Sequence, residues 1–116
     1  MLAAVLTVFA ALAIPPPTAL VVVYRPHGDA MRGARAWTLA CTPPSGTHPR
    51  PGAACRELLV HPDALRPASR PCRALPRPGS PEAEVLGAFN GNTIDRTFVP
   101  SCGPWWRDLH SLLTGT

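Results

Sequence analysis

Apolar residues cluster in four short segments that predict β-strands. Each segment is rich in β-branched or aromatic residues and is bounded by proline, glycine or asparagine, which is typical of strands. The four segments are residues 19–24, 36–41, 85–89 and 93–99. Turn residues between the first two predict an antiparallel pair. Asn90-Gly91 between the last two predicts a tight hairpin, because both central residues of a type I′ turn need positive φ.

Helical patterns are fewer and shorter. Residues 53–60 form the best helix candidate, because the segment follows Pro51-Gly52 and ends before Pro62. A weaker helical turn is predicted at 63–65. The pattern therefore predicts one clear helix beside the strands.

Two further segments complete the prediction. Residues 42–49 are rich in proline, serine and glycine and are predicted to be a loop. Residues 103–116 carry enough tryptophan and leucine to cover one face of a sheet. Over so few residues the periodicity leaves open whether that segment is a turn of helix or a last strand.

The N-terminal residues 1–14 are almost wholly apolar. This run is too short to span a bilayer, and it is typical of the apolar region of a secretory signal peptide, although no positive charge precedes it. Ala11-Leu12-Ala13 offers small residues where a signal peptidase reads. We therefore predict a signal peptide over 1–13 and a secreted, extracellular domain over 14–116, with no membrane attachment in the mature form. The alternative is a buried first strand.

Composition narrows the class of protein. A chain of 116 residues is enough for one domain with a modest core. Sixteen prolines and nine glycines argue against an all-helical fold, and an apolar fraction of 46% argues against disorder. The basic residues are all arginine and give a net charge of +4, but they are scattered and form no stripe with interleaved aromatics. Nucleic acid is therefore not expected as a partner.

The four cysteines indicate an oxidising compartment. At positions 41, 55, 72 and 102 they lie 14, 17 and 30 residues apart, so no Cys-x-x-Cys pair is present and a zinc ribbon or thioredoxin-type site is not expected. In a short secreted chain four cysteines predict two disulfides, for which three connectivities exist.

The residues give no pattern for catalysis or for a metal. The four histidines are His27, His48, His61 and His110, and no two have the helical spacing of metal ligands. No Gly-x-Ser-x-Gly elbow is present, and with two disulfides formed no thiol is free to act as a nucleophile. Glu82 and Glu84 alternate on a short extended piece and are expected to face solvent. We therefore predict neither an enzyme nor a bound cofactor or metal.

The segment 70–81 is the strongest candidate for function. It contains four prolines and one cysteine, listed in order as Pro71, Cys72, Pro76, Pro78 and Pro81. Proline fixes its own φ and pushes the preceding residue towards extended backbone. We expect a stiff, extended and exposed loop tied to the rest of the domain at Cys72. The alternative is a proline-rich surface connection without a function.

Three segments carry a resemblance to the Streptomyces subtilisin inhibitor family. They are Trp37-Thr38-Leu39-Ala40-Cys41, Pro44-Ser45-Gly46-Thr47-His48-Pro49, and Ala53-Ala54-Cys55 followed by Glu57-Leu58. Asp95-Arg96-Thr97-Phe98 before Cys102 is similar to that family's Glu-Arg-x-Phe strand before its last cysteine, and the interval from Cys72 to Cys102 is also similar. The resemblance covers about residues 19–102.

The resemblance implies an α+β fold, with an antiparallel sheet of about five strands and two short helices packed on it. It implies the disulfides Cys41–Cys55 and Cys72–Cys102, and a homodimer made through the sheet. It also implies reversible inhibition of extracellular serine proteases, chiefly subtilisin-like enzymes. The family's reactive bond lies two residues beyond the third cysteine, which here is Ala74–Leu75. On this resemblance Ala74 enters the specificity pocket of a subtilisin-like or elastase-like protease, with Pro71 and Arg73 touching its rim.

Several departures from the family pattern leave alternatives open. A register slipped by one residue would make Arg73 the specificity residue and the target trypsin-like. Pro76 lies two residues past the bond, where an extended inhibitor offers a backbone N–H that proline lacks. The intervals on both sides of the loop differ in length from the family's. The second hypothesis is therefore a secreted, disulfide-linked binding or structural protein that keeps the fold without inhibition.

Overall fold

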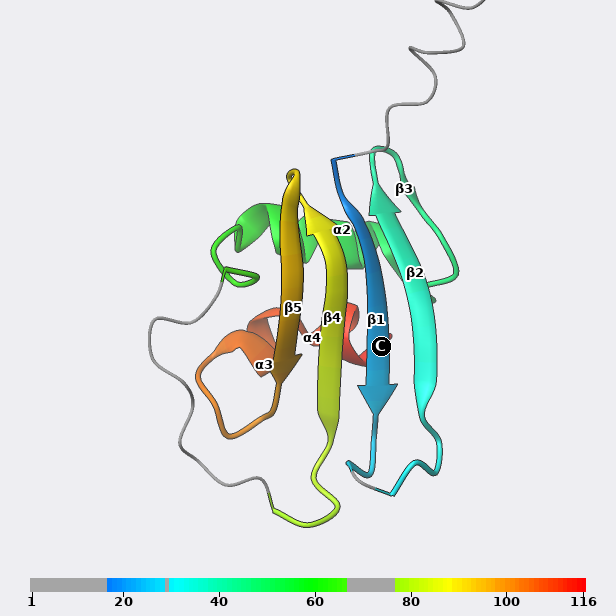
Figure 1. Cartoon of the computed structure of the whole chain (residues 1–116), viewed down its shortest axis with the longest axis vertical. Coiled ribbons are helices and arrows are strands. Elements are labelled where there is room, and N and C mark those ends of the chain that lie inside the picture. The colour runs from blue at the N-terminus through cyan, green and yellow to red at the C-terminus, as the bar shows by residue number, and fades with distance from the viewer. Residues whose placement is uncertain (1–16, 29, 67–76) are drawn as a thin grey trace, which may run out of the picture.

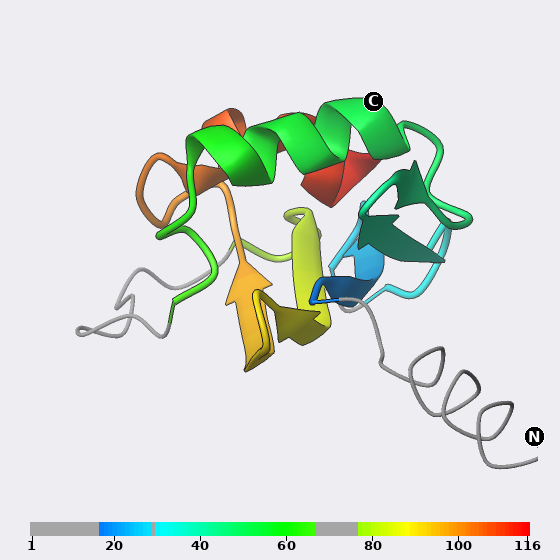
Figure 2. The same cartoon turned by 90° about the horizontal axis from the view of Figure 1, so that it is seen from above.

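The computed structural model describes residues 17–28, 30–66 and 77–116, and their strands form one antiparallel sheet in the order β3-β2-β1-β4-β5. All helices of the described residues lie on one face of this sheet, and none of the described elements covers the other face, which is called the uncovered face below (Figures 1 and 2). The elements in chain order are β1 (Ala19–Arg25), β2 (Arg35–Cys41), β3 (Pro44–Ser45), α2 (Pro51–Val60), β4 (Glu82–Phe89), β5 (Asn92–Phe98), α3 (Trp105–Asp108) and α4 (His110–Thr114). The predicted α+β architecture with five strands is confirmed. Within the described part of the chain, no helix is long and apolar enough to cross a bilayer.

Strand β1 is the centre of the sheet. Its Val22 lies opposite Trp37 of β2 on one side and opposite Val85 of β4 on the other. Alternate residues of the strands are buried beneath the helices, as the period of two along a strand requires. Val22 and Val85 are fully buried, and burying such a side chain contributes about 1.5–3 kcal/mol.

The helical layer supplies the other half of the core. Helix α2 buries Ala54 and Leu58, and the C-terminal segment buries Leu109, Leu112 and Leu113. The sequence left the segment 103–116 open between helix and strand, and the structure resolves this as two short helices, α3 and α4. Two helices were expected in this layer, and the described residues contain three.

The hairpin predicted from Asn90-Gly91 is confirmed. Asn90 has φ 50° and Gly91 has φ 82°, which is the positive φ that the turn needs. The turn is also bonded to the start of β1, because the Gly91 N–H donates to the Pro17 carbonyl over 2.9 Å. The hairpin therefore fixes the place where the described chain enters the sheet.

The prediction of loop over 42–49 was wrong at Pro44–Ser45, which form the edge strand β3. Ser45 lies opposite Ala40 of β2, and two reciprocal bonds lie beside this pair: the Thr38 N–H donates to the Thr47 hydroxyl and the Thr47 N–H donates to the Thr38 hydroxyl. A proline fits an edge strand, since its missing N–H is not needed on the free side. A strand of two residues is too short to show any alternation in the sequence.

Other boundaries differ from the prediction by a few residues. Helix α2 begins at Pro51 and not at Ala53, because a proline is tolerated in the first turn, where the N–H has no intrahelical partner. Strand β4 begins at Glu82, three residues before the predicted start. Asp63-Ala64-Leu65, predicted as a weak helical turn, is a hydrogen-bonded turn and not a helix.

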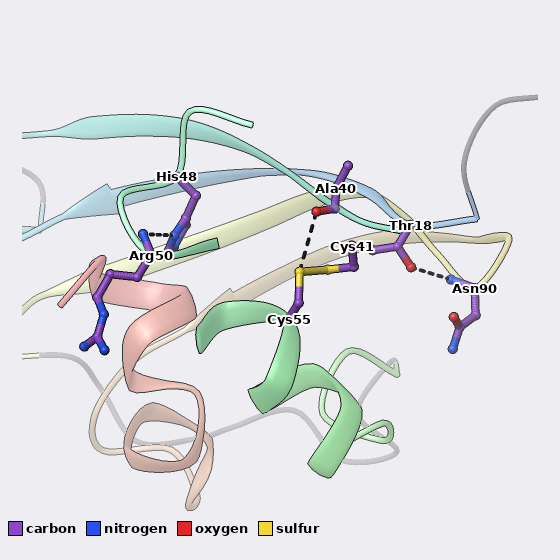
Figure 3. Close-up of a disulfide and its surroundings, with 7 residues drawn as sticks. All are labelled: Thr18, Ala40, Cys41, His48, Arg50, Cys55 and Asn90. Carbon is purple, nitrogen blue, oxygen red and sulfur yellow. Dashed lines mark hydrogen bonds between the residues drawn. A yellow bond between two sulfur atoms is a disulfide. The ribbon is translucent and has the colours of Figure 1, made fainter. Parts of the chain in front are cut away.

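The expected disulfide Cys41–Cys55 is present and joins the end of β2 to α2, with the two Cα atoms 5.6 Å apart (Figure 3). A cross-link that closes a loop of this size contributes about 3 kcal/mol in the chain-entropy picture. Because a small domain is stable by only about 5–15 kcal/mol, this bond is a large part of what holds α2 on the sheet.

Candidate functional site

The residues expected to act lie outside the described residues. They are Pro71, Cys72, Arg73, Ala74, Leu75 and Pro76. The structure does describe the two flanks of this segment, residues 61–66 before it and residues 77–81 after it (Figure 1). The site is therefore built here from its flanks and from the side chains that hold them.

The upstream flank is a turn that anchors itself in the core. Its backbone is closed by two bonds, from the Ala64 N–H to the His61 carbonyl and from the Arg66 N–H to the Asp63 carbonyl. Ala64 and Leu65 are fully buried. The exposed Arg66 is the last described residue before the gap, and its side chain makes a surface ion pair with Asp63 at 3.2 Å.

Arg96 of β5 holds this flank from the sheet. Its Nη1 donates to the Ala64 carbonyl and, over 2.8 Å, to the Arg66 carbonyl. Its guanidinium carbon lies 4.8 Å from the centre of the Phe98 ring, a cation–π contact. Burial lowers the pKa of Arg96 from its ordinary value, because desolvation disfavours the charged form. The guanidinium is therefore partly desolvated, and backbone carbonyls and an aromatic ring face compensate for the lost hydration of its charge.

The downstream flank is a turn that leads into β4. The Ser80 N–H donates to the Arg77 carbonyl over 2.9 Å, and the chain then enters the sheet at Glu82. There Arg25 at the end of β1 donates to Glu82 over 2.8 Å and to Glu84 over 3.1 Å. Glu82 and Glu84 were expected to face solvent, and they lie on the face of the sheet that the helices leave free, where both are half-buried and paired with Arg25.

Cys102 follows β5 and is disulfide-bonded. Its N–H also donates to the Val99 carbonyl over 3.2 Å. The partner that the resemblance implies, Cys72, lies outside the described residues.

His48 joins the loop before α2 to the C-terminal helix α4. The His48 Nδ1 accepts the Arg50 N–H over 3.0 Å (Figure 3), so the neutral ring carries its proton on Nε2, which donates to the Leu112 carbonyl over 3.0 Å. His48 is buried. Its role is therefore structural, and among the described residues no group of three or more histidine, cysteine or acidic side chains could hold a metal ion.

Sequence reasoning missed the role of Arg96, although a signal for it exists. Ile94, Arg96 and Phe98 alternate along β5, so the arginine shares the apolar face of the strand. A charged residue in phase with buried apolar residues needs a partner. The pairing of Arg25 with Glu82 and Glu84 has no such signal, because it depends on β1 and β4 lying side by side.

Comparison with known proteins identifies the family. No curated protein matches the chain. Among solved structures, the crystal structure of Streptomyces caespitosus sermetstatin in complex with Bacillus licheniformis subtilisin is similar, with 27% sequence identity, a TM-score of 0.49, and coverage of 80% of this chain and 92% of that chain. The profile of the subtilisin inhibitor-like family matches residues 16–97, which is most of the chain. The chain therefore belongs to the subtilisin inhibitor-like family and is a protease inhibitor rather than an enzyme.

Proposed function

We propose that this protein is a secreted inhibitor of serine proteases that presents the bond Ala74–Leu75 to the protease. The observation that carries the proposal is membership in the subtilisin inhibitor-like family, which supports serine-protease inhibition in general terms. The position of the bond follows from the family pattern, two residues beyond the third cysteine, Cys72. Secretion is supported by the apolar residues 1–13 and by the disulfides.

The mechanism needs no catalytic group on this chain. An extended segment adds to the protease as a strand through backbone hydrogen bonds. The catalytic triad and the oxyanion hole belong to the protease. The role of the inhibitor is to hold the segment in its bound shape before docking, so that little conformational entropy is lost on binding. The prolines at 71 and 76 and the cysteine at 72 fit that role, since each restricts the backbone.

Ala74 sets the proposed specificity. A methyl group fits the pocket of a subtilisin-like or elastase-like protease, and it has no charge to pair with the aspartate of a trypsin-like pocket. Arg73 supplies that charge if the register is shifted by one residue. Pro76 has no N–H to offer the protease and weakens the leaving side of the contact. A protein that keeps the fold without inhibiting is therefore the second candidate.

We also propose that two copies associate through the uncovered face of the sheet. This face carries Val21, which is 40% exposed, beside the half-buried Val23 and Leu86. Val21 and Leu86 lie directly opposite each other on β1 and β4, so the apolar side chains are at the centre of the sheet. A second copy of this chain is the proposed occupant, because twofold symmetry lets one such face cover another.

The inhibition is tested by titrating the mature, oxidised protein against subtilisin, an elastase-like enzyme and trypsin. We expect stoichiometric loss of subtilisin activity. Ala74→Asp should weaken it at least about 30-fold, the effect of losing one contact worth 2 kcal/mol or more. Ala30→Asp, the same change at an exposed alanine outside the reactive segment, serves as the matched control.

Three outcomes distinguish the proposed inhibition through Ala74 from its alternatives. Inhibition of trypsin that is lost in Arg73→Ala would move the specificity residue to Arg73. Cleavage after Ala74 without inhibition would show that the loop binds as an ordinary substrate. No effect on any of the three proteases at micromolar concentration would favour the non-inhibiting alternative.

A further inference from the structure

We propose that Arg96 is a positioning residue for inhibition: it holds the upstream flank of the reactive segment against the sheet, so that tight binding and resistance to cleavage depend on it. The inference rests on the proposed function, since it assigns to Arg96 a part in the same site. It does not require Arg96 to touch the protease.

The first observation is the place of Arg96 in the fold. It lies on edge strand β5, opposite Val85 of β4, and it shares a strand face with the buried Ile94 and Phe98. A charged group on the apolar face of a sheet costs free energy unless its donors are used. This position therefore has to be explained by what the guanidinium binds.

The second observation is what Arg96 binds. Its Nη1 donates to the carbonyls of Ala64 and Arg66, and its guanidinium lies over the ring of Phe98. Both acceptors are backbone groups of the upstream flank. A bond to a backbone carbonyl fixes the path of the chain itself, whatever side chain stands there.

The third observation is how near the contacts of Arg96 with the Ala64 and Arg66 carbonyls, called the brace below, lie to the proposed bond along the sequence. Arg66 is six positions before Cys72, and the buried Leu65 sets the same flank from the core side. Cys102, which is disulfide-bonded, follows the same strand β5. Strand β5 thus carries Arg96 for the upstream flank and is followed by Cys102, whose partner by the family resemblance is Cys72 of the segment.

Loss of the brace should act on the loop more than on the fold. Ala64 and Leu65 remain packed in the core without it, and β5 remains paired with β4 along its length. The carbonyls of the flank, however, would no longer have a donor from the sheet. A less fixed flank gives the segment more conformations to lose on docking.

The experiment compares Arg96→Met, which keeps the length of the side chain and removes its donors, with Arg96→Lys, which keeps the charge without the planar fork. Arg107→Met makes the same change of charge at an exposed position and serves as the control. Three quantities are measured well below the melting temperature: the inhibition constant for subtilisin, the rate at which bound subtilisin cleaves Ala74–Leu75, and the fraction folded. We expect Arg96→Met to weaken inhibition and to speed cleavage by roughly ten- to hundredfold at unchanged fraction folded, with Arg96→Lys between it and wild type.

A fully folded Arg96→Met that inhibits and resists cleavage as the wild type does would overturn the inference and leave the proposed function intact. The same holds if Arg107→Met has an equal effect. A wild-type protein that fails to inhibit would overturn both. If Arg96→Met does not fold, Arg96→Lys decides the matter, since faster cleavage in a folded lysine variant supports the brace and wild-type behaviour contradicts it.

Discussion

At the scale of single residues, the Glu57 carboxylate links two helices. Glu57 belongs to α2, and its two oxygens accept the N–H groups of Ser111 over 3.0 Å and Leu112 over 2.8 Å at the start of α4. Helix α4 has no side-chain cap of its own. The first N–H groups of a helix have no intrahelical acceptor and favour a negative charge. Glu57 therefore provides from a distance what a local cap would provide.

Replacing Glu57 tests this role. Glu57→Gln should lower the free energy of unfolding by about 1–2 kcal/mol, because an amide offers one acceptor oxygen where the carboxylate offers two. Glu57→Ala should cost about 2–3 kcal/mol, since both N–H groups then lose their acceptor. Urea unfolding measures both changes.

Asp63→Asn provides the comparison, because it removes a carboxylate whose ion pair with Arg66 is exposed to solvent and should be worth less than about 1 kcal/mol. Equal losses for Glu57→Gln and Asp63→Asn would contradict the cap.

Residue-level prediction succeeded where one segment contains the whole signal. Asn90-Gly91 predicted the hairpin because both residues of the turn are adjacent in the sequence. The ion pairs of Glu82 and Glu84 were not predicted because their partner, Arg25, is 57 and 59 residues away. Until β1 and β4 are known to be neighbours, nothing in the sequence distinguishes a paired acid from a solvated one.

At the scale of elements, Gly87 shows what the pattern of apolar residues leaves out. It lies within β4 with φ 127°, and a Cβ at this position would lie 2.2 Å from the Ala19 carbonyl oxygen of β1. The sequence predicts a strand over 85–89 without marking this residue. The close approach of two backbones is a property of the paired strands, so the strand was predictable and its need for glycine was not.

We predict that Gly87→Ala lowers the free energy of unfolding by roughly 3–5 kcal/mol, because it combines backbone strain with a clash against a central strand. Gly91→Ala is the matched control, since Gly91 also has positive φ, at 82°, but no atom lies within 4 Å of its added Cβ. It should cost only about 1–2 kcal/mol. Thermal or urea unfolding followed by circular dichroism measures both, and similar costs would show that the contact with Ala19 relaxes easily.

At the scale of the whole molecule, the described residues place every helix on one face of the sheet and none on the other (Figure 2). The pattern of apolar residues predicted four strands and one clear helix, but it did not predict the order of the strands or which face the helices cover. The α+β class and the proposed bond Ala74–Leu75 came from the resemblance to a family, which was not used to predict the strand order either. The physical reason is that strand order depends on contacts between distant segments, whereas periodicity reports only which side of its own segment is apolar.

The uncovered face leads to a prediction about assembly. In solution the mature protein should be a dimer, and Val21→Arg should convert it to a folded monomer. The monomer tolerates the change because Val21 is partly exposed, so that a long arginine side chain can keep its charge in water. In the dimer the same charge would be buried without a partner, at a cost of about 3–5 kcal/mol, and twofold symmetry introduces it twice. The dimer dissociation constant should therefore rise by at least about a thousandfold, as sedimentation equilibrium can measure.

Thr97→Arg distinguishes the apolar centre of this face from its edge. Thr97 lies on the edge strand β5, directly opposite Glu84 of β4. The arginine in Thr97→Arg therefore has the same neighbouring acid, Glu84, as the arginine in Val21→Arg. Thr97 is exposed at the side of the sheet, where an arginine can still reach solvent. If the apolar centre drives association, Thr97→Arg should remain a dimer while Val21→Arg is monomeric. A wild-type protein that is monomeric at tens of micromolar would show that two copies do not cover this face and that Val21 stays exposed in solution.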